Sequence, residues 1–114
     1  MAEREKDTEK WLRQQIEKLG GVFWKFTSPG TDGVPDRIAV FPDGRLVFVE
    51  LKTGIGKLKQ IQRYQIGRLL LLQQQVCVVH GRKAADRFLQ DMQWHSVSSV
   101  EYYSDGEYDL LHEG

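Results

Sequence analysis

The chain of 114 residues has one cysteine and three prolines, and it lacks any long apolar run. One cysteine excludes an internal disulfide, and Cys77 lies in the apolar run 76–79, where a buried thiol is far commoner than a nucleophile. No apolar stretch approaches the roughly 18 residues that a membrane span requires. The charged N-terminal segment 1–10 is also unlike a secretory signal. We therefore expect a cytoplasmic protein that is not secreted and has no membrane partner.

Acidic residues are missing from the middle of the chain, and basic residues are missing from its end. The formal net charge is +0, yet all 16 lysines and arginines precede position 100, and residues 101–114 hold five acids. The segment between Lys52 and Lys83 contains no acid and five further bases: Lys57, Lys59, Arg63, Arg68 and Arg82. Such a stretch is typical of phosphate binding, and its plainer interpretation is a solvated helix face.

Hydrophobic periodicity predicts a single mixed α/β domain, because no repeat or linker interrupts the chain and its 40% hydrophobic content suffices for one core. The expected elements are a helix that is capped by Asp7 or Thr8 and stopped by Gly20-Gly21, strands 22–26, 37–41 and 46–51, a helix 58–72, a strand 76–79 and a helix 83–92. Two short runs on either side of Ser104-Asp105-Gly106 predict a final hairpin.

Two acidic residues fall opposite each other in the hairpin predicted for residues 37–51. The tripeptide 42–44, Pro-Asp-Gly, fits a three-residue loop, since proline sets a type I turn and glycine accepts the left-handed position. This loop places Asp36 opposite Glu50. Because side chains alternate along a strand, Lys52 projects from the same face as both carboxylates. Two carboxylates facing each other across a ladder repel and should destabilise an ordinary hairpin.

A divalent metal accounts for the facing carboxylates. One or two carboxylates hold Mg²⁺ or Mn²⁺ and leave positions open for water and a phosphate. Lys52 would then orient or deprotonate the attacking water, or stabilise charge on the phosphate. The alternative is an ordinary hairpin with charges at its frayed end. A two-residue loop would favour that alternative, because it would place Asp36 on the other face.

The helix after Lys52 carries a second clue. A helical wheel places four apolar residues of this helix on one face: Leu58, Ile61, Leu69 and Leu72. Gln62 and Gln65 fall on the same face, where a packed amide needs a partner. Gln62 lies at the end near Lys52, so we expect it to contact an active-site water, a ligand carboxylate or a phosphate. Gln65 lies one turn further on and is expected to be a satisfied core residue.

Other candidate groups lack the spacing that their chemistry requires. His80, His95 and His112 follow no metal-ligand pattern and are expected at the surface or at strand ends. Gly54 and Gly56 precede a helix but lack the Gly-Lys-Ser/Thr ending of a nucleotide-binding loop, so we expect no nucleotide cofactor.

Three motifs occur in order along the chain: Gly33-Val34-Pro35-Asp36-Arg37, then Phe48-Val49-Glu50-Leu51-Lys52, then Gly56-Lys57-Leu58 with Gln62. Over about residues 5–90 the chain resembles the virus-type replication-repair nuclease (VRR-NUC) domain, a branch of the PD-(D/E)xK nuclease superfamily. The resemblance implies an α/β fold of the restriction-endonuclease type, a four-stranded mixed sheet flanked by helices. The nuclease core would span about residues 5–92, with residues 93–114 as an acidic C-terminal extension.

The resemblance also implies metal-dependent hydrolysis of DNA phosphodiesters and a further acid from the first helix. Glu5 and Glu9 both lie near the apolar face of that helix. Glu5 precedes the expected cap, so Glu9 is the preferred candidate.

The expected catalytic set comprises Asp36, Glu50, Lys52, Glu9 and Gln62. The expected metal ligands are Asp36, Glu50, the main-chain carbonyl of Leu51 and, through water, Glu9. The expected contacts to DNA phosphates are Lys25, Arg37, Lys57, Lys59, Arg63 and Arg68, which contribute charge rather than sequence recognition.

The small size of the chain bears on the substrate, since one such body offers little surface for gripping a duplex. We expect a phage or bacterial homodimer that acts in DNA repair on branched DNA such as four-way junctions. The alternatives are a flap- or end-processing nuclease and a non-catalytic DNA-binding subunit of the same fold. The tyrosines and leucines of residues 101–114 are too many for a disordered segment, so we expect an ordered hairpin that packs on the basic body or at a dimer interface.

Overall fold

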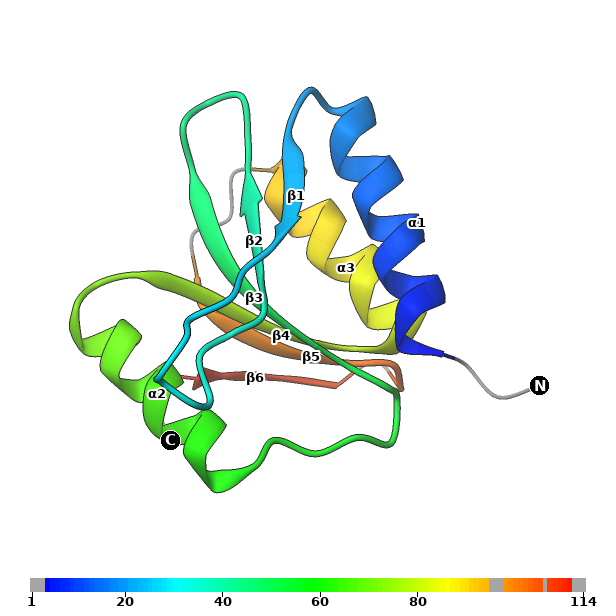
Figure 1. Ribbon diagram of the computed structural model, residues 1–114. Coiled ribbons are helices and arrows are strands. Elements are labelled where there is room, and N and C mark those ends of the chain that lie inside the picture. Colours follow the sequence, from blue (N-terminus) through cyan, green and yellow to red (C-terminus); the bar gives the residue numbers. More distant parts are fainter. Residues whose placement is uncertain (1–3, 95–97, 106, 112–114) are drawn as a thin grey trace.

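The computed structural model describes residues 4–94, 98–105 and 107–111 (Figure 1). Its elements are, in chain order, α1 (Glu5–Lys18), β1 (Val22–Lys25), β2 (Arg37–Val40), β3 (Leu46–Lys52), α2 (Gln60–Leu71), β4 (Gln75–His80), α3 (Gly81–Gln93), β5 (Val100–Tyr103) and β6 (Tyr108–Leu110). Each predicted helix and strand is present, with ends that differ by a few residues. No described helix is long and apolar enough to cross a membrane.

The described strands form one six-stranded sheet in the order β1-β2-β3-β4-β5-β6. Strands β1 to β3 are antiparallel, β4 and β5 run parallel to β3, and β6 returns antiparallel to β5. The expectation of four strands is therefore wrong. The C-terminal hairpin is ordered as predicted, but it extends the main sheet because Val100 and Tyr102 are buried in the same core as the other strands.

The two faces of the sheet are covered differently. Helices α1 and α3 pack together over one face, and α2 lies against the other, beside β4 (Figure 1). The main core fills the space under α1 and α3, and its largest fully buried apolar members are Tyr102, Phe23, Phe88, Leu12, Ile16, Leu51 and Met92. A smaller cluster under α2 consists of Ile66, Val76 and Val78.

Helix α1 begins earlier than predicted. Arg4 occupies the N-cap position without a side-chain cap, so the helix includes Glu5. Thr8, which was expected as a cap, is instead 2% exposed within the helix. The predicted stop is correct, because Gly20 adopts a φ of 90° directly after the C-cap, a conformation that glycine adopts without strain.

Helix α2 packs only part of the predicted apolar face against the sheet. Gln65 and Ile66 are its buried residues and Leu69 packs against the same cluster, whereas Ile61 and Leu72 are 43% and 66% exposed. Ile66 packs against Val76 and Val78 of β4. The contact with β4, which a helical wheel does not show, determines the buried stripe.

The β2–β3 hairpin has the predicted three-residue loop. The main-chain N–H of Phe41 donates to the carbonyl of Arg45 at 2.9 Å, and Gly44 has a φ of 93°. Arg37 pairs with Val49 in the ladder. Asp36, the residue before Arg37, therefore lies opposite Glu50, as the sequence predicts.

Candidate active site

Asp36 stands directly before β2 and is tied to both neighbouring strands. Its carbonyl accepts a hydrogen bond from the main-chain N–H of Phe26 at 2.8 Å, and its own N–H donates to the Glu50 carboxylate. Its Oδ2 lies 3.0 Å from Nη1 of Arg37. Its Oδ1 is buried and has no hydrogen-bond partner among the described residues. A buried oxygen of this kind needs a donor or a cation to offset its desolvation.

Glu50 is 5% exposed, in the C-terminal half of β3. Burial raises the pKa of Glu50 to about 7, with the nearby charge of Asp36 acting in the same direction. The Lys52 ammonium opposes this rise, and its Nζ lies 4.0 Å from Oε2 of Glu50. The two facing carboxylates therefore repel each other, and only part of that repulsion is offset within the protein.

Gln62 contacts the active site from α2, as the sequence predicts. Its Nε2 donates to Oε2 of Glu50 at 3.3 Å, and its Oε1 accepts from the main-chain N–H of Lys59 at 2.8 Å. The second bond fixes which end of the amide faces the carboxylate. Gln65 is buried one turn further on, where the sequence placed it.

The structure brings Glu5, and not Glu9, toward the facing carboxylates. Glu9 pairs with Nε of Arg37 at 3.6 Å and with Nε of Arg13 at 3.5 Å. Burial raises the pKa of Glu5, and the charge of Asp36 raises it further. Glu5 also acts electrostatically on Glu50. The early start of α1 explains the difference, because it places Glu5 in the first turn of the helix.

The residues of the site fit a divalent ion that takes only some of its ligands from the protein. Among the described residues, no three carboxylate, imidazole or thiol groups converge closely enough to surround an ion. Asp36 and Glu50 nevertheless offer facing oxygens, one of them unpartnered. Mg²⁺ is commonly held by one or two carboxylates and completes its shell with water and phosphate oxygens. Leu51 lies between the site residues of β3, with its side chain in the core.

The predicted phosphate contacts occupy different environments. Lys25, Lys57 and Lys59 are exposed. Arg68 lies over the Tyr64 ring at 6.0 Å. By contrast, the Arg37 side chain is 12% exposed and forms ion pairs with Asp36 and Glu9. Arg37 therefore holds acidic residues of the site in place.

A buried polar cluster lies next to the site and was not predicted. His80 ends β4, one of the two positions expected for it, and it is buried there, with 2% of its surface exposed. Its Nε2 lies 2.7 Å from Oε2 of Glu101 on β5. Parallel pairing makes His80 the neighbour of Lys52 in the sheet. His95 and His112 lie outside the described residues.

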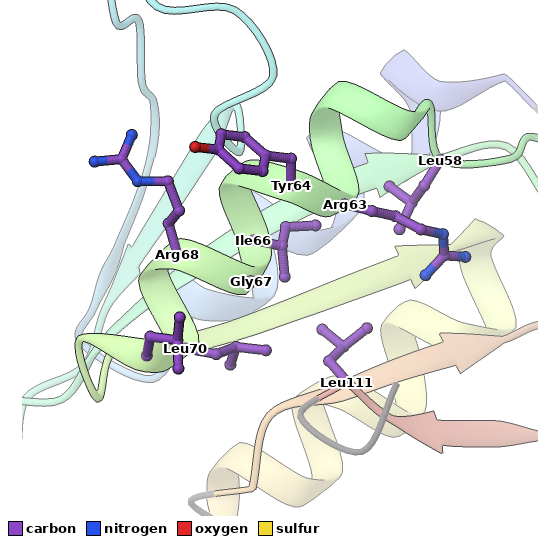
Figure 2. Close-up of a pocket in the computed structure, with 9 residues that line it drawn as sticks. Leu58, Arg63, Tyr64, Ile66, Gly67, Arg68, Leu70 and Leu111 are labelled. Atoms are coloured by element: carbon purple, nitrogen blue, oxygen red, sulfur yellow. The ribbon is translucent and has the colours of Figure 1, made fainter.

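An apolar groove of about 570 Å³ lies beside α2, away from the facing carboxylates. Figure 2 shows Leu111 opposite the helix across this groove, with Arg63 and Arg68 projecting at its two ends. Leu71, which also lines the groove, is 85% exposed. The described carboxylates of the site do not line this groove, so it is a separate feature of the surface.

No family model matches the chain. It is 42% identical over 79 residues to "Putative nuclease p44" of Acyrthosiphon pisum secondary endosymbiont phage 1, covering 69% of this chain and 85% of that protein. A solved VRR_NUC domain is similar with a TM-score of 0.72 at 29% identity, covering 78% of this chain and 97% of that one. Its similarity to these two proteins, together with its fold, shows that the chain belongs to the VRR-NUC family of nucleases.

Proposed function

We propose that the protein is a Mg²⁺- or Mn²⁺-dependent endonuclease that hydrolyses DNA phosphodiesters. The observation that carries the proposal is the pair Asp36 and Glu50, which face each other beside Lys52 with one buried oxygen unpartnered. Without a bound cation the two carboxylates repel each other and lower the stability of the fold. A metal-binding site accounts for a pair that is unfavourable in the metal-free protein.

Asp36 and Glu50 would hold the ion, together with the main-chain carbonyl of Leu51. When bound, the ion supplies a Lewis acid and lowers the pKa of a water ligand. Gln62 restrains the Glu50 carboxylate through Oε2. Glu5 is the acid of α1 that would reach the ion through water, in place of Glu9.

In the proposed mechanism Lys52 acts as the general base in its neutral amine form, or as the charge-stabilising group in its ammonium form. Its ammonium lies on the same face of β3 as Glu50, at 4.0 Å from Oε2, and its side chain is 16% exposed. From this position Lys52 orients the attacking water or neutralises charge that develops on the phosphate.

The test of this site combines metal titration with one conservative substitution. Wild-type protein should cut DNA with Mg²⁺ or Mn²⁺ and stop when a chelator is added. Asp36→Asn should abolish cutting, whereas Asp86→Asn, an exposed change of equal charge on α3, should leave it unchanged. Circular dichroism and thermal unfolding would show that both variants fold. Full cutting by Asp36→Asn would overturn the assignment.

Branched DNA is the proposed substrate, with a homodimer as the active form. The protein has a radius of gyration of only 13.0 Å, so one copy covers little of a duplex. A symmetric dimer would present two sites to two strands, the arrangement that a four-way junction requires. The alternative is a nuclease acting on flaps or ends. A non-catalytic DNA-binding subunit is disfavoured because Asp36, Glu50 and Lys52 are all present and adjacent.

A comparison of substrates separates these alternatives. Purified protein would be incubated with a four-way junction, a flap and a plain duplex, and its mass would be measured by light scattering at the same concentration. Paired cuts in opposite strands of the junction by a dimer support the proposal. A monomer that cuts only flaps or ends supports the alternative instead.

The role of the C-terminal hairpin in a dimer is better tested by a single substitution than by truncation. Removing β5 and β6 would take Val100 and Tyr102 out of the core, so a truncated chain would lose its fold as well as any interface. Leu111→Asp changes one partly exposed residue at the edge of the groove. If the hairpin lies at a dimer interface, this variant shifts the protein toward monomer without unfolding it.

A further inference from the structure

Helix α2 carries Gln62 toward Glu50, and its apolar packing lies in its second half, where Ile66 is buried and Leu69 and Leu70 are partly buried. In its first turn Ile61 is 43% exposed and the Arg63 side chain is 56% exposed. Apolar burial holds a helix in place roughly in proportion to the area removed from water. The position of the first turn of α2 therefore depends strongly on its polar contacts with the sheet.

Two polar contacts tie this turn to the sheet, and they come from consecutive residues. Gln62 donates to Glu50 on β3 at 3.3 Å. Nη1 of Arg63 lies 3.6 Å from Oε1 of Glu101 on β5. Because β4 lies between β3 and β5, the two contacts straddle the central strand.

Glu101 is a fixed anchor for Arg63. It is 2% exposed, and its other oxygen, Oε2, lies 2.7 Å from Nε2 of His80. The Tyr103 hydroxyl also hydrogen-bonds Glu101, and the Tyr103 ring stacks on His80 at 4.8 Å. A carboxylate held from two sides has little freedom to follow a moving helix.

The charge state of Glu101 suits this role. Burial alone would raise the pKa of Glu101, but the hydrogen bond from His80 and the charge of Arg63 hold that pKa below its ordinary value. The carboxyl is therefore ionised at neutral pH, and it attracts the Arg63 guanidinium from a buried position on the sheet.

We infer that Glu101 is a positioning residue of the active site, an inference that rests on the proposed function. Held by His80 and Tyr103, Glu101 fixes Arg63, and Arg63 fixes the turn that presents the Gln62 amide to Glu50. The C-terminal strand β5 thereby supports the Glu50 carboxylate on β3 across the one intervening strand, β4. Glu101 itself does not contact the facing carboxylates, so it acts through Arg63 and Gln62.

A double-mutant cycle tests this pathway. Glu101→Gln should lower kcat about tenfold at saturating DNA, while KM changes less than twofold, since coupled neighbours commonly interact at this level. In a Gln62→Ala background, Glu101→Gln should have no further effect on kcat. Glu107→Gln, an equal charge change at an exposed position on the same hairpin, serves as the control. Independent, multiplicative losses in the double variant would overturn the inference.

A substitution on the helix avoids disturbing the buried cluster. Arg63 is 56% exposed, so Arg63→Met and Arg63→Lys should both fold. Lysine keeps the charge that Glu101 attracts, and it should recover most of the kcat that methionine loses. Equal kcat in both variants and wild type would contradict the positioning role.

A spectroscopic measurement separates this inference from the proposed function. The side-chain amide resonances of Gln62 in the metal-free protein should shift in Glu101→Gln and stay unchanged in Glu107→Gln. Unchanged resonances would overturn the inference even if the enzyme is active. An inactive wild type with shifted resonances would instead leave the positioning intact and refute the endonuclease.

Discussion

The two faces of the sheet differ in what their side chains do. Under α1 and α3 the sheet contributes to a continuous apolar core that includes Phe23, Val49 and Phe88. Under α2 the buried apolar cluster among the described residues is smaller, with Ile66, Val76 and Val78 at its centre and partly buried residues such as Phe48 and Leu69 packed against it. The same side of the sheet holds Glu50, Lys52 and, from α2, Gln62 of the candidate active site, together with the His80–Glu101 pair.

Strand β3 shows how one segment serves both faces. Val47, Val49 and Leu51 are buried in the main core, whereas the alternate residues Glu50 and Lys52 project to the α2 face. The apolar face supplies the folding energy that offsets the buried, repelling charges of the other face. Substitutions should accordingly reduce stability on one face and activity on the other.

The largest effect on stability is expected in the main core. Phe88→Ala removes a fully buried ring and should lower the free energy of unfolding by about 3–5 kcal/mol. Leu71→Ala on α2 removes a side chain that is 85% exposed and should change it by less than about 0.5 kcal/mol. Denaturant unfolding measures both values. Similar losses in the two variants would contradict the division between faces.

Lys52→Ala, on the α2 face, should reduce activity rather than stability. Loss of the ammonium should lower kcat by a factor of about 10²–10⁴, the range for groups that assist proton transfer or charge stabilisation. DNA affinity should remain within a few-fold, since one phosphate contact at most is lost. Single-turnover kinetics and a binding titration separate the two quantities. A variant that loses only affinity would make Lys52 a phosphate anchor and refute its catalytic role.

The raised pKa of Glu50 predicts a pH-dependent stability of the metal-free protein. The folded state binds a proton with a pKa of about 7, above the ordinary value of 4.5. The contribution of this group is fully present below about pH 4.5 and is lost as pH rises through 7, by about 3 kcal/mol in all. Glu50→Gln should remove this decline and be more stable than wild type at pH 8.

The matched control for this pH profile is Glu107→Gln, which changes the same charge at an exposed position. Thermal or denaturant unfolding between pH 4.5 and 8 would give the difference between each variant and wild type. A Glu50→Gln profile parallel to that of wild type would show that burial does not perturb this carboxyl.

The smallest effect is expected at the exposed bases beside α2. Lys57→Ala should weaken DNA binding on every sequence and reduce the slope of log affinity against log salt by about one unit, if Lys57 contacts one phosphate. Lys18→Ala, at the far end of α1, removes the same charge away from the site and should leave the slope unchanged. Equal slopes in both variants would remove Lys57 from the DNA-binding surface.

The sequence by itself determined the local parts of the site. Turn chemistry at residues 42–44 fixes the hairpin register, and the register places Asp36 opposite Glu50 and on the face of Lys52. Strand periodicity is a property of neighbouring residues, so it is readable without any knowledge of packing. The helical wheel placed Gln62 on the packed face of its helix near Lys52, and its contact with Glu50 is one of the three kinds of contact expected from that position.

Only the tertiary structure decided the parts that depend on distant segments. Glu5 rather than Glu9 approaches the carboxylates because α1 starts without a side-chain cap, and Arg37 draws Glu9 into an ion pair. The sheet has six strands because β5 completes the core beside β4. The His80–Glu101 pair joins residues 21 positions apart. Such contacts arise from packing between elements, which no local pattern of residues encodes.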